Sequence, residues 1–166
     1  HPERTMFAQG LAKVCLEGSA MRISKDVRTT TALGETFAFL ADFTTTERWD
    51  PGTIATQRLD GDGGVGTRYL NTSRFRGRTT QLVYEVTDHR PDALIALRGE
   101  NSTLTAHDTM AFTALPDGGT QVHYEARFRL KGWARLAAPF LRPAFRQLGR
   151  DASVSMREVL DRLAVD

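Results

Sequence analysis

The sequence has almost no cysteine and no long apolar run, and both absences limit where the protein works. Cys15 is the only cysteine, so the chain has no internal disulfide and no cysteine cluster for zinc, which suits a reducing cytoplasm. No apolar stretch reaches the length needed to cross a bilayer. Residues 6–16 are mildly apolar, but Gln9, Gly10 and Lys13 interrupt them, which makes a poor signal-peptide core. We therefore expect a cytoplasmic protein without an integral membrane segment.

Patterns that bind metals or cofactors are also missing. The four histidines, at positions 1, 89, 107 and 123, lack metal-ligand spacing, although His107 and His123 are expected on the outer faces of neighbouring strands. The stretch 61–66 matches G-x-G-x-x-G, but it joins two predicted strands and opens no helix, so it is not a dinucleotide site. Asp60 and Asp62 lack the downstream acidic ligand of a calcium loop. We expect no metal and no cofactor.

Composition is typical of one globular domain, but the charge is unevenly distributed. The 166 residues are 40% hydrophobic and 25% charged, and a net charge of +2 is too small to indicate a nucleic-acid partner. Between Arg127 and Arg150, however, seven side chains are cationic and none is acidic. This segment is either a solvated helix face or a contact for an anionic headgroup, an acyl carrier protein or a phosphate-bearing ligand. We expect residues 1–20 to form an extension and residues 21–166 to form the domain.

The last third of the chain, residues 130–163, has the apolar period of one long amphipathic helix. At about 100° per residue, small and apolar side chains share one half-turn and five arginines lie opposite them. The predicted inner side comprises Trp133, Ala137, Phe140, Leu141, Ala144, Phe145, Leu148, Ala152, Ser155 and Val159. Pro139 and Pro143 either bend this helix or separate a short first segment from it.

The chain before this helix is predicted to be mostly strands. A strand over 22–30 precedes a helix over 33–41, capped by threonines 29–31, and a short helix that begins with a capping box of Thr44 and Glu47. Turn residues separate six further strands, at 53–60, 66–75, 78–89, 93–100, 104–115 and 120–130. In the last strand Tyr124 and Phe128 share one face, and His123 lies on the other. A sheet with one dry face needs a cover, and the final helix is the only segment able to supply it.

Several short stretches occur in a characteristic order along residues 21–163. They are TTTALGETF at 29–37, AD at 41–42 seven residues before Trp49, VGTR at 65–68, VTDHRP at 86–91, GGTQV at 118–122 and the closing helix. Together they resemble the helix-grip, START-like (SRPBCC) superfamily, in its polyketide cyclase/dehydrase and lipid-transport branch. One departure is Thr31-Ala32, which replaces the small residue and proline that usually follow the first strand.

The resemblance implies an α+β helix-grip fold with an elongated apolar cavity. A curved seven-stranded antiparallel sheet would wrap around the long C-terminal helix, and two short helices would follow the first strand. Strand parity and the helix pattern then give candidate ligand-binding residues on both walls. They are Trp49, Tyr69, Leu82, Tyr84, Met110, Phe112, Tyr124, Phe128, Trp133, Phe140 and Phe145. For each of them plain core packing is the alternative.

Polar side chains that point into such a cavity are the catalytic candidates: Asp108, Tyr84 and Arg68. Asp108 shares strand parity with Met110, so we expect it inside, as a general base or, as we favour, paired with Arg68, Arg74 or Arg98. Arg68 and Tyr69 alternate, so only one of them is interior. In cyclases and aromatases that the chain resembles, arginine and tyrosine orient a polyketide chain and stabilise enolate charge.

These residues and the resemblance predict three possible functions. The first is a binder or carrier of a small hydrophobic or amphipathic molecule, such as a lipid or a polyketide-like compound. The alternative is a polyketide cyclase, aromatase or dehydratase that acts on a ligand in the same cavity, which requires at least two convergent ionisable side chains. A third is a stress-response or chaperone-interacting module that uses the arginine face. We expect no nucleic-acid partner, and a homodimer stays open.

Overall fold

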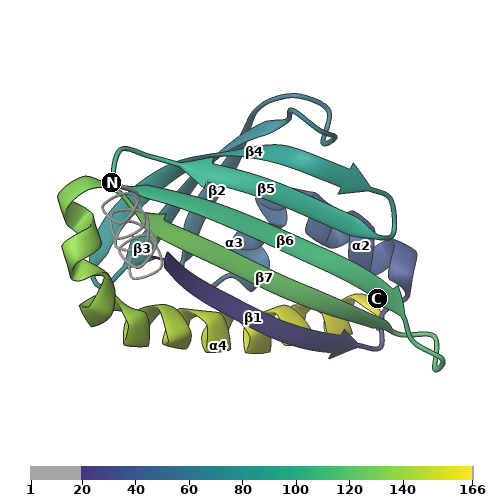
Figure 1. Cartoon of the computed structure of the whole chain (residues 1–166). Coiled ribbons are helices and arrows are strands. Elements are labelled where there is room, and N and C mark those ends of the chain that lie inside the picture. The colour runs from purple at the N-terminus through teal and green to yellow at the C-terminus, as the bar shows by residue number, and fades with distance from the viewer. Residues whose placement is uncertain (1–19, 166) are drawn as a thin grey trace, which may run out of the picture.

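The computed structural model describes residues 20–165, which form a seven-stranded antiparallel sheet packed against helices (Figure 1). The elements in chain order are β1 (Ala20–Thr29), α2 (Leu33–Ala41), the 3₁₀ helix η1 (Phe43–Thr45), α3 (Thr46–Trp49), β2 (Thr53–Asp60), β3 (Arg68–Phe75), β4 (Arg78–Arg90), β5 (Leu94–Glu100), β6 (Leu104–Ala114), β7 (Thr120–Leu130), the 3₁₀ helix η2 (Gly132–Ala137) and α4 (Ala138–Leu163). The predicted α+β helix-grip fold is confirmed. Of the expected N-terminal extension, only Ala20 lies within the described residues, and it begins β1. Within residues 20–165 no helix combines the length and the apolar character needed to span a membrane.

The strand order is β1-β7-β6-β5-β4-β3-β2, so the first strand pairs with the last and the other strands form a meander. Alternation decides which face is buried, as β7 shows: Val122, Tyr124, Ala126 and Phe128 are buried on one face, while the residues between them are partly or fully exposed. The core therefore lies on one face of the sheet.

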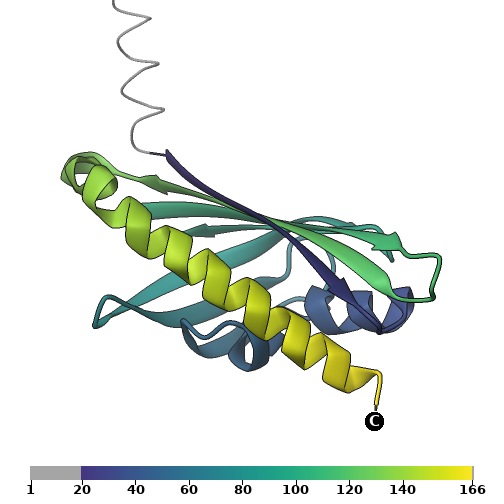
Figure 2. The ribbon, with the colours of Figure 1, turned by 90° about the horizontal axis from the view of Figure 1, so that it is seen from below.

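Helix α4 crosses this face and packs mainly on β1 (Figure 2). Close approach depends on Gly149, because a Cβ atom at this position would lie 2.5 Å from Cγ2 of Ile23. Ala152 and Met156 continue the buried side of the helix. Small residues at the contact let the backbone of the helix approach the strand, and Met156 fills the space beside it.

The predicted inner side of the final helix was partly wrong. Trp133 is 82% exposed and Phe140 is 78% exposed, although both were expected to face the core. Residues 132–137 form the separate segment η2, and α4 begins only at Ala138, which supports the alternative of a short first segment. Along α4, Phe140 points about 140° away from the buried Phe145, so it faces solvent.

The predicted helix caps were also wrong, because the threonines serve tertiary contacts instead. Ala32 is the N-cap of α2, and no side chain caps that helix. The Thr31 hydroxyl donates to the Leu160 carbonyl at 2.5 Å, so it ties the end of β1 to the last turns of α4. Likewise, Glu47 Oε1 accepts a 2.7 Å hydrogen bond from the Thr56 amide of β2 rather than closing a capping box.

Candidate ligand-binding cavity

A cavity of about 110 Å³ lies between the inner face of the sheet and α4. Side chains reach it from α3, from the sheet and from α4, so every layer of the fold contributes to its wall. Seven of the residues singled out from the sequence line it: Trp49, Leu82, Tyr84, Asp108, Tyr124, Phe128 and Phe145. Carbon dominates the lining, and the polar groups are few and individually placed.

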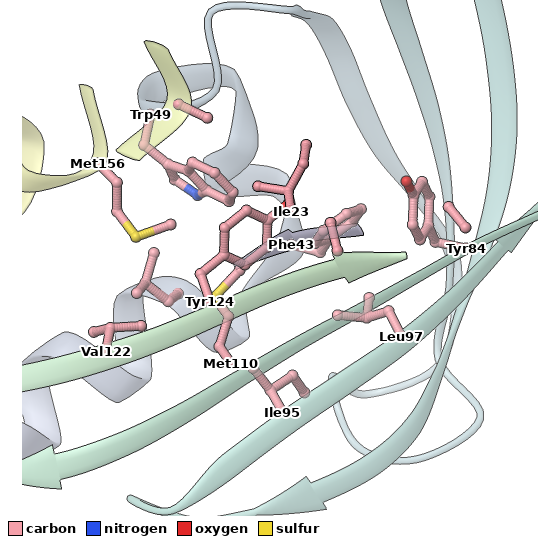
Figure 3. Close-up of a cluster of buried hydrophobic side chains, with 14 of the residues drawn as sticks. Ile23, Phe43, Trp49, Tyr84, Ile95, Leu97, Met110, Val122, Tyr124 and Met156 are labelled. Carbon is pink, nitrogen blue, oxygen red and sulfur yellow. The ribbon is translucent and has the colours of Figure 1, made fainter. Parts of the chain in front are cut away.

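Aromatic rings from distant parts of the chain form much of the wall. Trp49 of α3 and Tyr124 of β7 pack edge to face, with ring centroids 5.9 Å apart (Figure 3). Phe43 of η1 packs against Tyr84 of β4 at 4.7 Å. The 3₁₀ helix η1 and helix α3 therefore hold one rim of the cavity against the sheet.

Three phenylalanines close the cavity on the side of the β3–β4 hairpin. The Phe145 ring of α4 lies 4.6 Å from the Phe75 ring and 4.8 Å from the Phe128 ring, measured between centroids. Such ring pairs are held by weak contacts and not by hydrogen bonds.

The position of Tyr84 depends on the glycine opposite it. Tyr84 of β4 pairs with Gly99 of β5, and a Cβ atom at Gly99 would lie 2.7 Å from the tyrosine ring. The missing side chain lets the ring lie across β5 toward β6, where Asp108 resides. No sequence pattern pointed to this role of Gly99, because it depends on which strands are neighbours.

Asp108 is a buried carboxyl group at the polar end of the cavity. It is 7% exposed, and its Oδ1 atom has no hydrogen-bond partner among the described residues. Burial, and then the negative charge of Asp50, raise the pKa of Asp108 to about 7, while hydrogen bonding from the Tyr84 hydroxyl opposes the rise. Burial also raises the pKa of Tyr84 well above its ordinary value, so this hydroxyl remains protonated and able to donate.

The arginine partners that we expected for Asp108 are engaged elsewhere or do not reach it. Arg68 binds Asp60 at 2.5 Å, and Arg98 pairs with Glu100. Arg74 lines the cavity, but in the described part of the chain no ion pair joins it to Asp108. The favoured structural pairing was therefore wrong, because no ion pair joins Asp108 to a cation within residues 20–165.

Trp49 and Asp50 provide two further polar groups, and Asp50 was not among the residues singled out from the sequence. The indole Nε1 of Trp49 is buried and has no hydrogen-bond partner in the part of the chain that the structure describes. Asp50 accepts hydrogen bonds from the Gly52 amide at 3.0 Å and from the Thr53 hydroxyl at 2.9 Å. Burial nevertheless raises its pKa. The signal for Asp50 was its position in an Asx turn that follows a buried helix end.

An amide and hydroxyl network forms the remaining polar wall, and no sequence motif had indicated it. Asn71 Nδ2 donates to the Thr56 hydroxyl at 2.9 Å, and Ser73 donates to Asn71 Oδ1 at 2.5 Å. Thr46 joins the network through a 2.6 Å contact with Thr56. These polar groups hydrogen-bond one another, so they position the wall without requiring a ligand.

Within residues 20–165, no group of three histidine, cysteine, aspartate or glutamate side chains is arranged to hold a metal ion.

A comparison with protein families matches residues 21–165 to polyketide cyclase / dehydrase and lipid transport. The chain belongs to this family. No curated protein matches the chain by sequence.

Solved structures share the helix-grip fold of the family at low sequence identity. The Zhui aromatase/cyclase from Streptomyces sp. R1128 is 14% identical with a TM-score of 0.71, over 87% of this chain and 93% of that one. A START superfamily protein from Mycobacterium smegmatis is 11% identical with a TM-score of 0.72, over 86% and 98%. The di-domain ARO/CYC BexL from the BE-7585A biosynthetic pathway is 13% identical with a TM-score of 0.66, over 85% of this chain. The chain spans 50% of the length of BexL.

The remaining candidates lie away from the cavity of this family member. Tyr69, Met110 and Phe112 are buried in the core but do not line the cavity. Trp133 and Phe140 are exposed and lie outside it. Arg68 is on the outer face, and its neighbour Tyr69 is the interior one of the two. Of the three catalytic candidates, the structure brings Asp108 and Tyr84 together and leaves Arg68 apart.

Proposed function

We propose that the protein binds a small amphipathic molecule in the cavity between the sheet and α4. The observation that supports this proposal is a pair of buried polar atoms without partners, Asp108 Oδ1 and Trp49 Nε1, in a cavity otherwise lined mainly by carbon. Buried polar groups are nearly always hydrogen-bonded, so such atoms indicate where a ligand supplies the partner. The ligand would donate to Asp108 and accept from Trp49, as a hydroxyl group does.

The size of the cavity limits what enters without rearrangement. Sites for drug-sized ligands measure roughly 300–1,000 Å³, whereas this cavity measures about 110 Å³. An apolar cavity of roughly 150 Å³ in another protein holds benzene. Because this cavity is smaller still, a hydroxylated single ring is the largest ligand class that we expect to enter without rearrangement, and a longer lipid or polyketide-like chain requires the stack of Phe75, Phe128 and Phe145 to open.

Phenol and benzene are a matched pair of probes for this proposal, because they differ only in the hydroxyl group. Calorimetric titration should give tighter binding of phenol, by at least about tenfold, since a hydrogen bond to a charged group contributes roughly 1.5–3 kcal/mol. Asp108→Leu should remove that preference while benzene binding is retained. Trp49→Phe should reduce the preference in the same direction, because it removes the indole donor.

A control variant separates loss of a ligand contact from a general loss of charge. Asp88→Asn removes a carboxyl group of β4 that pairs with Arg90 outside the cavity, and it should bind phenol as the wild type does. Equal affinities for phenol and benzene in the wild-type protein would contradict the polar role of Asp108. Failure of both probes to bind, with no molecule co-purifying in native mass spectrometry, would contradict the binding function itself.

The second candidate function is catalysis as a cyclase, aromatase or dehydratase, and the observation that favours it is the contact between Asp108 and Tyr84. With a pKa of about 7, Asp108 is divided between acid and base near neutral pH. Its carboxylate could take a proton from the carbon beside a ligand carbonyl, while the Tyr84 hydroxyl donates to the developing enolate oxygen. The protonated carboxyl group would then return the proton to a leaving β-hydroxyl, which departs as water.

A β-hydroxy thioester tests this second function, with loss of water followed by mass spectrometry. The rate should depend on an ionisation near pH 7, and Asp108→Asn should lower it by about 100-fold or more. Tyr84→Phe should lower the rate less, and Asp88→Asn should leave it unchanged. A thioester returned unchanged at every pH by a protein that binds phenol would leave binding as the function and reject catalysis.

A further inference from the structure

The start of α4 and the segment before it present large apolar side chains to solvent. Trp133 is 82% exposed, Leu136 is 80% exposed and Phe140 is 78% exposed. Trp133 and Leu136 lie in η2, and Phe140 lies in the first turn of α4, so the three belong to one short stretch of chain. Single exposed apolar residues are common, but three large ones in eight residues make a patch that needs a partner.

Cations flank this patch in the sequence, and others come from the β3–β4 hairpin. The stretch 127–150 carries seven cationic residues and no acidic one. The β3–β4 hairpin adds Arg74, Arg76 and Arg78, with no acidic residue among them. Figure 2 shows the hairpin and the start of α4 at the same end of the molecule, and the contact between Phe75 and Phe145 joins them. We call this region, residues 74–78 and 129–146, the basic end.

Glu100, an acidic residue beside this end, is already paired with cations. Glu100 accepts from Lys131 at 2.8 Å and pairs with Arg98, so it does not offset the charge of Arg76 or Arg135. The basic end therefore combines an exposed tryptophan, leucine and phenylalanine with a net positive charge. Its partner must be negatively charged and must also accept apolar side chains.

We propose that the basic end docks on an anionic lipid bilayer, with Trp133, Leu136 and Phe140 entering the interfacial region. Tryptophan and other apolar side chains bind at the level of the headgroups, and surrounding arginines are attracted to anionic lipids. The start of α4 lies at a protruding end of the molecule (Figure 2), which suits a broad fluid surface better than an inserted peptide. This inference stands whether or not the cavity holds a ligand.

Docking in this orientation would turn one end of the cavity toward the bilayer. Phe145 belongs to the stack that closes the cavity, and it follows Phe140 by five residues, about 7.5 Å along the helix axis. A molecule leaving the bilayer would therefore meet the phenylalanine stack first. The Thr29 end of β1 and the C-terminal half of α4 would remain in water.

Vesicle binding by the full chain tests the proposal. Sedimentation with phosphatidylcholine vesicles should recover little protein, and vesicles that also contain phosphatidylglycerol should recover most of it at low salt. Raising the salt concentration should weaken the binding, because the attraction is screened. The fluorescence should shift to the blue on binding, and Trp133 must be the source, because Trp49 is only 3% exposed in the free protein.

Variants separate the apolar and the charged contributions. Phe140→Ser with Leu136→Ser, and separately Arg76→Glu with Arg135→Glu, should each weaken binding to anionic vesicles by about tenfold. All four residues are exposed, so the fold should be unaffected by circular dichroism. Val65→Ser is the matched control, because this exposed apolar residue lies in the β2–β3 loop, outside the basic end.

Three outcomes would overturn the proposal. One is the absence of binding to anionic vesicles at low salt. Another is binding that the variants of the basic end reduce no more than Val65→Ser does. The third is a dimer in solution that the apolar variants convert to monomer, since the patch would then be an interface between two copies of this chain.

Discussion

Replacing Asp108 by asparagine should make the protein more stable at neutral and alkaline pH. The wild-type carboxyl group is buried beside a second carboxyl group, and its pKa is raised from 3.8 to about 7. A carboxyl group whose pKa is higher in the folded state binds more protons there than in the unfolded chain. The free energy of unfolding therefore falls as the pH rises between these two values, and it is fully reduced above about pH 7. Asparagine keeps the shape and carries no charge.

The size of the effect follows from the same values. Each pKa unit corresponds to ~1.4 kcal/mol, so a rise from 3.8 to about 7 lowers the stability by up to about 4 kcal/mol above pH 7. Relaxation around the charged group reduces this figure, so we expect a gain of about 2–4 kcal/mol for Asp108→Asn at pH 8. At pH 4 most of the gain should be absent, because the wild-type carboxyl group is then protonated in the folded state.

Urea denaturation at a series of pH values measures this difference. Between pH 4 and pH 7 the wild type should lose stability relative to Asp108→Asn, whose remaining pH dependence comes from other groups, among them Asp50 with a raised pKa and Glu100 and Glu125 with lowered pKa values. Glu85→Gln, on the outer face of β4, should keep the wild-type slope. Equal slopes for the wild type and Asp108→Asn would refute the reasoning, since they would mean that the carboxyl group is not disfavoured by burial.

Two further predictions concern the glycines that set the packing. Gly99→Ala should cost about 1–3 kcal/mol, because its Cβ atom would lie 2.7 Å from the Tyr84 ring, and urea denaturation should show a smaller cost in a Tyr84→Leu background. Gly149→Ala should cost a similar amount, because its Cβ atom would lie 2.5 Å from Ile23, and an Ile23→Ala background should relieve it. Costs that are the same in both backgrounds would show that the clash is not their cause.

The strands could be predicted from the sequence because their sheet is dry on one face only. Apolar alternation then appears directly in the chain, and turn residues mark where each strand ends. The predicted limits 53–60 and 120–130 coincide with β2 and β7, and the other strands differ by one or two residues at an end. The same alternation identified Asp108, Tyr84 and Tyr124 as inward-facing.

The orientation of α4 could not be predicted in this way, because the size of its apolar side chains does not show which side of this helix is buried. The contact with β1 requires a glycine at 149, and the side around it carries alanine and methionine as well as aromatic residues. Trp133 and Phe140 have the largest apolar side chains in the early part of the segment, yet they are exposed. A hydrophobic pattern shows which side of a helix is apolar, but it does not show whether that side packs in the core or binds a partner.

The polar end of the cavity could not be predicted from the sequence for a different reason. The contact between Tyr84 and Asp108 depends on which strands are neighbours in the sheet. Tyr84 reaches toward Asp108 only because β5 lies between their strands and carries Gly99 at the crossing point. No local pattern specifies that arrangement. An apolar residue at 108 would fold at lower cost because it carries no charge to bury, yet this position holds a carboxyl group with no arginine to neutralise it. Local choices that oppose stability are concentrated at functional sites, and this carboxyl group is therefore the strongest reason to place the function in the cavity.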